Sequence, residues 1–197
     1  MDKTIIQATA KDLPFVLSLQ KKFSNQIGFI PKPAVEKYLE AGKVFRGDLN
    51  EQEAGFLLLR ETPCQNPGVF SIVQAAVKLD AQRHSLGFCL TGRAEKAAKE
   101  AGGKLIQAAC REDLDSNCFW QAAGFTLVAM RAGGQARGQR VLLWRKAVLE
   151  GTDLRIFHTP KYNLGANGRF CKLSKMEEWK LVEQRPIEPI DIERACL

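Results

Sequence analysis

A short polar loop at residues 82–87, QRHSLG, is the stretch of this chain best suited to chemistry. It follows an apolar run over residues 69–79 and leads into a segment, starting at Gly87, whose apolar residues have helical spacing. The first N–H groups of a helix have no partner within the helix, and the helix dipole adds partial positive charge there. This order of strand, loop and helix start therefore predicts a site that holds an anionic group.

A second stretch with polar and aromatic residues runs from Asn117 to Phe125. Asn117 precedes a short helix predicted over residues 118–123, so helix capping is its simplest role. Phe119 and Trp120 lie on this helix, and aromatic residues at such positions are most often part of the core. Gly124 ends the helix.

The composition is that of a globular protein, with 45% hydrophobic and 26% charged residues among 197. No apolar run approaches the length of a membrane span, and the first residues do not resemble a signal peptide. We therefore expect a cytoplasmic protein without a membrane partner. The six cysteines form no C-x-x-C pair, and His84 and His158 lie far apart in the sequence, so no metal site is expected.

Basic residues give the chain a net charge of +7, and residues 131–146 contain basic residues but no acidic one. Such a stretch is typical of a solvated strand edge, where positive charge discourages pairing with other chains. It would also attract a polyanion, such as the phosphates of a cofactor or a nucleic acid. Both interpretations remain open at this point.

Strands and helices alternate along the first 150 residues. Strands are expected at residues 4–8, 43–47, 54–60, 69–79, 104–110, 125–131 and 139–149. Helices are expected at residues 13–23, 34–41, from Gly87 to Gly102, and at 118–123, with a further one at 173–183. Hairpins joined to one strand–helix–strand crossover imply a mixed, mostly antiparallel α/β sheet. We expect residues 1–150 to form one domain and residues 151–197 to form an extension that packs on it or on a partner.

The two polar stretches, taken in this order of elements, resemble the GNAT superfamily of N-acyltransferases from about Thr4 to Val148. The family pattern Q/R-x-x-G-x-G/A is matched by Gln82 and Gly87, and Ser85 stands where the first glycine is usual. An asparagine, an aromatic residue and a Gly-Phe pair follow in the family at the separation seen for Asn117 to Phe125. The resemblance implies the GNAT acyl-CoA N-acyltransferase fold, with a splay between the fourth and fifth strands.

The resemblance also implies a cofactor, acetyl-CoA or another acyl-CoA. Its pyrophosphate would lie on the backbone N–H groups of the 82–87 loop. The backbone of Val77 and Leu79, whose side chains are expected in the core, would pair with pantetheine, and the Val77 N–H would stabilise the oxyanion. The cofactor-binding residues implied are Val77, Leu79, Gln82, Arg83, His84, Ser85, Leu86, Gly87, Phe88, Asn117 and Phe119.

The residues that would move protons are less clearly marked. Trp120 occupies a position where many family members have a tyrosine acid, and an indole N–H cannot replace it. The CoA thiol, with a pKa of about 8.5, can leave as thiolate. Tyr162 and Tyr38 are the alternative acids. Gln74 stands where some relatives have a glutamate base, and surface solvation is expected for the three other carboxyl candidates, Glu53, Glu112 and Asp113.

The family places the acceptor beneath residues 27–31 and beside the basic loop at 132–140. The residues expected to contact the acceptor are Phe29, Ile30, Gln74 and Arg137. The function expected is direct transfer of an acetyl group from CoA to a primary amine of a small molecule, a peptide or a nucleic acid. A GNAT-like module that binds CoA or nucleic acid without transfer is the alternative. A homodimer formed through residues 151–197 is also possible on the sequence.

Overall fold

The computed structural model describes residues 1–61, 68–133, 139–155 and 179–182. By their contacts these residues form two compact units, each described here by itself. The first unit comprises Met1–Arg60 and Ile72–Glu100, and the second comprises Glu61–Ser71 and the chain from Ala101 onward. Among the described helices, none has both the length and the apolar character needed to cross a membrane.

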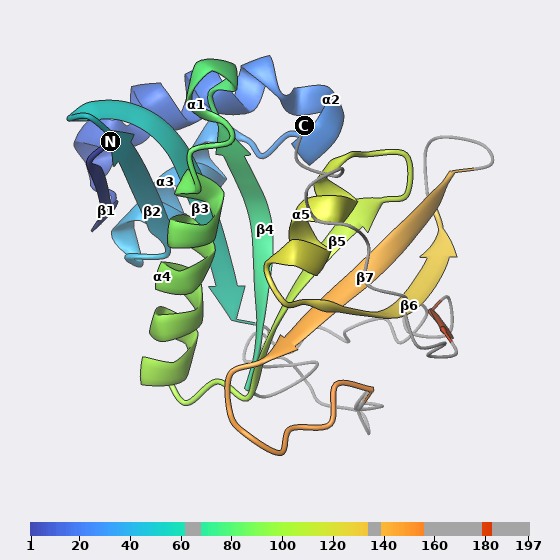
Figure 1. Cartoon of the computed structure of the whole chain (residues 1–197). Helices are drawn as coiled ribbons and strands as arrows, with labels where there is room; N and C mark the ends of the chain where they lie inside the picture. The colour runs from blue at the N-terminus through green and yellow to red at the C-terminus, as the bar shows by residue number, and fades with distance from the viewer. Residues whose placement is uncertain (62–67, 134–138, 156–178, 183–197) are drawn as a thin grey trace. The chain divides into compact units, whose positions relative to one another are not determined.

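A single mixed sheet carries the fold, with strand order β1-β2-β3-β4-β5-β7-β6-β8 (Figure 1). Its strands are β1 (Lys3–Gln7), β2 (Val44–Leu49), β3 (Gln52–Glu61), β4 (Val69–Val77), β5 (Leu105–Arg111), β6 (Thr126–Ala132), β7 (Arg140–Ala147) and β8 (Lys180–Leu181). The pairs β1/β2, β2/β3, β5/β7, β6/β7 and β6/β8 are antiparallel. This confirms the predicted mixed, mostly antiparallel α/β fold.

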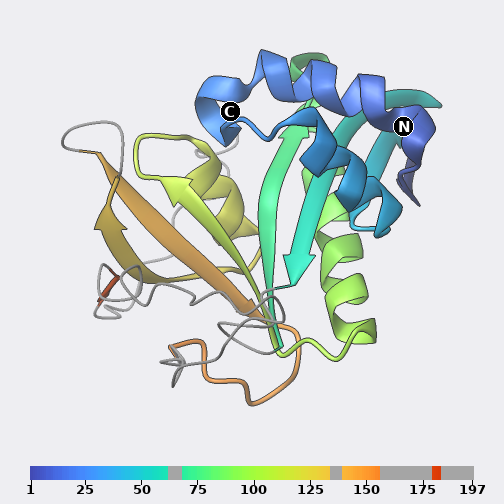
Figure 2. The ribbon, with the colours of Figure 1, turned by 180° about the vertical axis from the view of Figure 1, so that it is seen from behind.

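Helices cover both faces of the sheet in the first unit. Figures 1 and 2 show α4 (Leu86–Glu100) on one face of β2 and β3, and α1 (Leu13–Lys22) and α3 (Lys32–Glu40) on the other. Residues 54–59 of β3 are consequently all buried, because neither face of this strand meets solvent. Gly55 gives α4 close access, since a Cβ there would lie 3.2 Å from Leu90.

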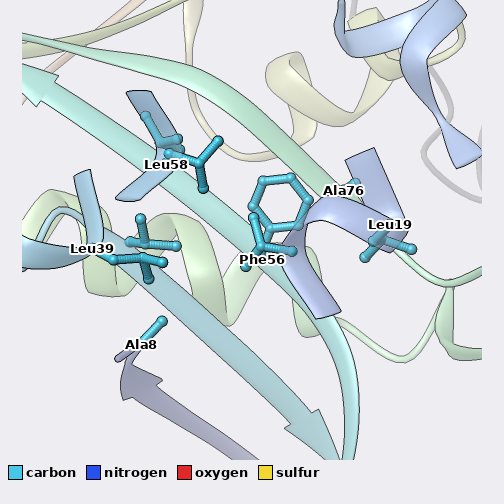
Figure 3. Close-up of a cluster of buried hydrophobic side chains, with 9 residues drawn as sticks. Ala8, Leu19, Leu39, Phe56, Leu58 and Ala76 are labelled. Carbon is cyan, nitrogen blue, oxygen red and sulfur yellow. The ribbon is translucent and has the colours of Figure 1, made fainter. Parts of the chain in front are cut away.

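The core of the first unit is a cluster of aliphatic and aromatic side chains between β3 and the helices α1 and α3 (Figure 3). Phe56 and Leu58 point into it from alternate positions of β3, as the twofold period of a strand requires. Val16, Leu19, Val35 and Leu39 contribute from the helices, and they are the residues at helical spacing in the sequence. This packing fixes α1 and α3 on the sheet.

A cluster of charges ties the start of α1 to the hairpin of β2 and β3. Arg46 donates to both oxygens of Asp48, at 2.9 and 2.8 Å, and also to Asp12 and Glu53. Its side chain is 20% exposed, and that of Asp12 is 6% exposed. Asp12 also accepts from the N–H and hydroxyl of Thr9, and so holds the turn that precedes α1.

In the second unit, α5 (Ser116–Ala122) packs against β5 and β6. Arg145 on β7 is 1% exposed and donates to Gln107 and to the carbonyl of Leu154. Burial lowers the pKa of Arg145 to about 10, so it stays charged at neutral pH. Its donated bonds therefore join residues that follow β7 to the sheet.

Several element boundaries differ from the prediction. The connection between the strands predicted at 43–47 and 54–60 is reduced to Asn50 and Glu51, whose φ values of 50° and 64° are those of a tight two-residue hairpin. A short helix, α2 (Ser24–Ile27), overlaps the connection between the helices predicted at 13–23 and 34–41. The helix predicted at 173–183 is wrong at Lys180–Leu181, which pairs with β6 as β8. The rest of that helix lies outside the described residues.

We expect substitution of Arg46 by alanine to destabilise the protein by roughly 3–5 kcal/mol, because three neighbouring carboxylates lose their shared cation in a largely buried setting. Urea unfolding of the variant measures the change. Lys96→Ala is the matched control, since Lys96 pairs with Glu100 on the surface at 71% and 58% side-chain exposure. The control should lose no more than about 0.5 kcal/mol. Equal losses in the two variants would contradict a stabilising role for this cluster.

Acid should weaken the same cluster. Burial raises the pKa of Asp12, but the hydrogen bonds from Thr9 and the charge of Arg46 outweigh it and hold the pKa below 3.8. A carboxyl with a lowered pKa stabilises the folded state above its unfolded pKa, and this contribution is lost as pH falls through the folded value. The urea concentration at the midpoint of unfolding should therefore fall as pH is lowered from about 5, and it should fall less steeply in Asp12→Asn than in the unmodified protein. Identical slopes for the two proteins would refute the assignment to Asp12.

Candidate functional site

The 82–87 loop joins η2 (Leu79–Ala81) to the first turn of α4. Arg83 and Ser85 are left-handed, with φ of 62° and 60°, and both are exposed. The carbonyl of Ser85 accepts the first bond of the helix from the N–H of Cys89, at 3.1 Å. Residues other than glycine rarely adopt this backbone, and Ser85 does so where the family pattern has glycine. The exposed residues Arg83 and Ser85 thus lead directly into the first turn of a 15-residue helix.

The end of β4 meets this loop through one side chain. Gln82 donates from Nε2 to the carbonyl of Val77, at 3.2 Å. The N–H of Lys78 donates to the carbonyl of Ala54 on β3, at 2.7 Å. Because successive backbone groups of a strand point to opposite edges, the N–H of Val77 points away from β3.

Apolar side chains border the loop on both sides. Leu79 is 61% exposed and Phe88 is 44% exposed. The prediction that the Leu79 side chain lies in the core is therefore wrong. Leu79 begins the short helix η2 instead of continuing β4, so its side chain does not lie on a covered face of the strand. Large exposed apolar side chains next to a polar loop offer contact surface for a ligand that is partly apolar.

A hollow of about 520 Å³ lies between α1 and η2 in the first unit. The ammonium group of Lys78 stands 5.4 Å from the centre of the Phe15 ring, a cation–π contact that holds this side chain over the hollow. The other lining residues are Ser18, Leu19, Lys22, Leu79 and Asp80.

The segment after α2, predicted to cover the acceptor, lies against β4. Gln74 is 3% exposed and donates to the carbonyls of Ile27 and Gly28, while Gln20 on α1 binds the N–H of Ile30. Phe29 is 73% exposed. The structure therefore brings Gln74 to this segment, and it adds Gln20, which the sequence pattern does not distinguish from any other helix residue.

In the second unit, Asn117 uses its whole amide to hold the turn before α5. Its Nδ2 donates to the carbonyls of Arg111, Glu112 and Leu114, at 2.8, 3.2 and 2.8 Å. Its Oδ1 accepts from the indole N–H of Trp144, at 2.9 Å. The geometry is that of a residue that orders a loop.

Trp120 is 7% exposed and packs edge-to-face against Phe119 and Phe125, with ring centres 5.0 and 5.2 Å away. It is a core aromatic residue. Burial raises the pKa of the neighbouring Cys110 thiol, although hydrogen bonds from Ser116 and Trp120 oppose the shift. Cys110 thus stays a thiol at neutral pH and is not a thiolate nucleophile.

The other carboxyl candidates lie at the surface, as expected, and each forms an ion pair with an arginine there. Glu112 accepts from the N–H and guanidinium of Arg140, and Asp113 binds the guanidinium of Arg111. These hydrogen bonds lower the pKa of both carboxyls, which makes them weak bases. Glu53 binds Arg46.

The remaining predicted residues are distributed as follows. Tyr38 packs against the core cluster of the first unit. Tyr162 and Arg137 lie outside the described residues. His84 is half-buried in the loop, next to Arg83. Among the described residues, no group of three or more His, Cys, Asp or Glu side chains could hold a metal ion.

Three solved structures share the architecture at low sequence identity. An acetyltransferase assigned to the GNAT family from Desulfovibrio desulfuricans matches with TM-score 0.64 and 18% identity, over 75% of this chain and 100% of its own. The ribosomal-protein-S18-alanine N-acetyltransferase from Escherichia coli matches with TM-score 0.60 and 16% identity, over 79% and 100%. N-acetylglutamate synthase from Neisseria gonorrhoeae, complexed with coenzyme A and N-acetyl-glutamate, matches with TM-score 0.59 and 16% identity, over 74% and 35%.

The fold is that of the GNAT acetyltransferases. No family model and no curated protein matches the chain by sequence. In the GNAT fold seen here, the 82–87 loop occupies the crossover from β4 to α4, as the sequence resemblance implies. The residue roles and the splay between β4 and β5 stay predictions.

Replacing Asn117 by alanine should destabilise the second unit by roughly 2 kcal/mol or more, because a buried indole N–H and three carbonyls lose a partner. Chemical unfolding followed by tryptophan fluorescence measures this. Cys118→Ala, at an exposed position of the same helix, is the matched control and should change little. A loss in Asn117→Ala no larger than in the control would show that these bonds contribute nothing.

Proposed function

We propose that this protein is an N-acyltransferase of the GNAT type that moves an acetyl group from CoA to a primary amine. The observation that supports it best is the left-handed backbone at Arg83 and Ser85, two exposed residues that lead into the first turn of α4. They lie in the crossover from β4 to α4, where a GNAT fold binds its cofactor. The small side chain at position 85 leaves room for a ligand beside this turn. The residues present thus fit a pyrophosphate.

The residues of the 82–87 loop and its neighbours bind different parts of the cofactor in this proposal. The backbone N–H groups of residues 83–87 bind the cofactor phosphates, and Gln82 steadies the loop by its bond to Val77. Leu79 and Phe88 contact the apolar arm of the cofactor, since both are exposed beside the loop. The N–H of Val77, which points away from β3, donates to the acyl oxygen and stabilises negative charge there.

The cofactor supplies an activated thioester. Its thiol has a pKa of about 8.5, so it can leave as thiolate without an acid that protonates it. This matters because Trp120 is buried among aromatic rings and Glu112 and Asp113 have lowered pKa values. The amine must therefore arrive deprotonated or lose its proton to water.

The same scarcity of acids and bases motivates a second candidate, a CoA-binding module without transfer. It differs from the first in one measurement, the release of free thiol from acetyl-CoA in the presence of amines. Binding without release across a panel of amines would favour it.

A nucleic-acid-linked acceptor finds less support in the structure. Of the basic residues at 131–146, Arg145 is buried, Arg140 pairs with Glu112, and Arg131 stacks on the ring of Trp179. These positive charges are therefore partly satisfied within the protein. A cytoplasmic location and a homodimer through residues 151–197 remain predictions.

Acetyl-CoA at about a hundred times its dissociation constant should stabilise the protein by about 2.7 kcal/mol, which raises the melting temperature by roughly 5–10 °C. Gly87→Trp should abolish the shift, because an indole in the first turn of α4 blocks the site. Gly92→Trp is the matched control on the same helix, since a Cβ at Gly92 meets nothing within 4 Å. Ser85→Gly should keep the shift, because glycine adopts a left-handed backbone without strain.

The absence of any shift at millimolar acetyl-CoA in the unmodified protein would count against the proposal. Equal loss of the shift in Gly87→Trp and Gly92→Trp would show that the effect is one of folding rather than of this loop.

A further inference from the structure

Two buried glutamines form a hydrogen-bonded pair between α1 and β4. Gln20 is 1% exposed and Gln74 is 3% exposed. The Nε2 of Gln20 donates to the Oε1 of Gln74, at 3.1 Å. Among the described residues, the other side-chain hydrogen bonds of the pair go to the segment at residues 27–30, which we call the acceptor loop.

The pair contacts this loop at three successive points of its backbone. Gln74 donates from Nε2 to the carbonyls of Ile27 and Gly28, at 3.2 and 3.0 Å. The Oε1 of Gln20 accepts from the N–H of Ile30, at 3.2 Å. Each amide therefore uses its oxygen and its nitrogen at once. A carboxylate in place of Gln74 would have no proton to donate and would face two carbonyl oxygens.

The backbone of the acceptor loop needs such support. Gly28 has φ 75° and ψ −176°, a region that is essentially restricted to glycine, and because glycine has no Cβ to limit its backbone, the surrounding contacts must hold this conformation. The next residue, Phe29, is 73% exposed. The loop thus holds a large aromatic side chain in solvent, while its neighbours Ile27 and Ile30 pack against the core cluster. The glutamine pair adds the hydrogen bonds that tie the backbone of the loop to β4 and α1.

We propose that Gln74 is a positioning residue that fixes the acceptor loop, and Phe29 with it, so that acceptor binding depends on an uncharged amide at position 74. This inference rests on the proposed transferase function for its consequence, although the contacts themselves do not. It assigns Gln74 a role different from that of a base, because both ends of its amide are already bonded. It also makes Gln20 a positioning residue, because Gln20 holds the N–H of Ile30 at the other end of the loop.

Gln74→Glu is the decisive variant because it is nearly isosteric and, when ionised, replaces the N–H donor by a negative charge that faces two carbonyl oxygens. Because burial raises the pKa of such a carboxyl, the variant is compared at pH 7 and pH 9. Gln20→Leu is the second variant, since it leaves the two bonds of Gln74 to the loop and removes the bonds to Ile30 and to the Oε1 of Gln74. Gln107→Glu is the matched control. Gln107 accepts from Arg145 and donates to Ser71, whose hydroxyl can reverse its role, so a carboxylate is tolerated there.

Two measurements separate the inference from the proposed function. Hydrogen exchange of the peptide covering residues 27–31 reports whether the loop is held, and needs no acceptor. Thiol release from acetyl-CoA with L-glutamate, spermidine and a peptide that begins with alanine reports transfer. In Gln74→Glu we expect exchange to rise and the KM for the amine to rise roughly ten-fold, with the acetyl-CoA melting shift retained. Gln20→Leu should show a smaller rise in both, and Gln107→Glu none.

Unchanged exchange in Gln74→Glu would overturn the inference while leaving the transferase proposal intact. A rise in exchange with no change in the KM for the amine would overturn the role in acceptor binding. Loss of the acetyl-CoA shift in Gln74→Glu would also overturn it, because the effect would then be one of global folding. Absence of thiol release by the unmodified protein with every amine would instead refute transfer to this panel, and exchange alone would then decide whether Gln74 holds the loop.

Discussion

The directions of the hydrogen-bonding groups on β4 constrain much of the first unit. Successive backbone groups of a strand point to opposite edges, so the bond from Lys78 to Ala54 on β3 leaves the N–H of Val77 directed away from it. The side chains alternate in the same way, and Gln74 reaches the acceptor loop from one face of the strand. One strand therefore carries a backbone donor along its edge and a positioning side chain on its face.

In each unit taken by itself, the candidate polar side chains are mostly hydrogen-bonded to other protein groups. Asn117, Gln74 and Gln20 each use both ends of their amides, and the carboxyls of Glu112 and Asp113 pair with arginines. A site of this kind offers fixed dipoles rather than titrating side chains. Such groups stabilise developing charge without reorganising, which suits transfer from a thioester that already has a good leaving group. The structure and the missing tyrosine are consistent on this point.

Sequence patterns predicted the elements well where one periodicity dominates. The apolar run of β3 and the helical spacing in α1 and α4 match the observed elements, because burial on both faces of a strand or on one face of a helix leaves a clear pattern. Boundaries failed where a few backbone angles decide. The β2–β3 turn consists only of Asn50 and Glu51 because both adopt positive φ. Their residue types allow this conformation, but the sequence pattern does not predict it.

The sequence by itself determined the order of strands and helices, the loop at Gln82–Gly87 and its resemblance to a GNAT pyrophosphate loop, since these depend on residues close together in the chain. The tertiary structure decided which polar side chains form hydrogen bonds with one another. Gln20 and Gln74 are 54 residues apart, and Asn117 and Trp144 are 27 apart, so no local pattern could pair them. Only the packing of α1 on β4, and of α5 beside β7, brings their amides within hydrogen-bonding distance of a partner.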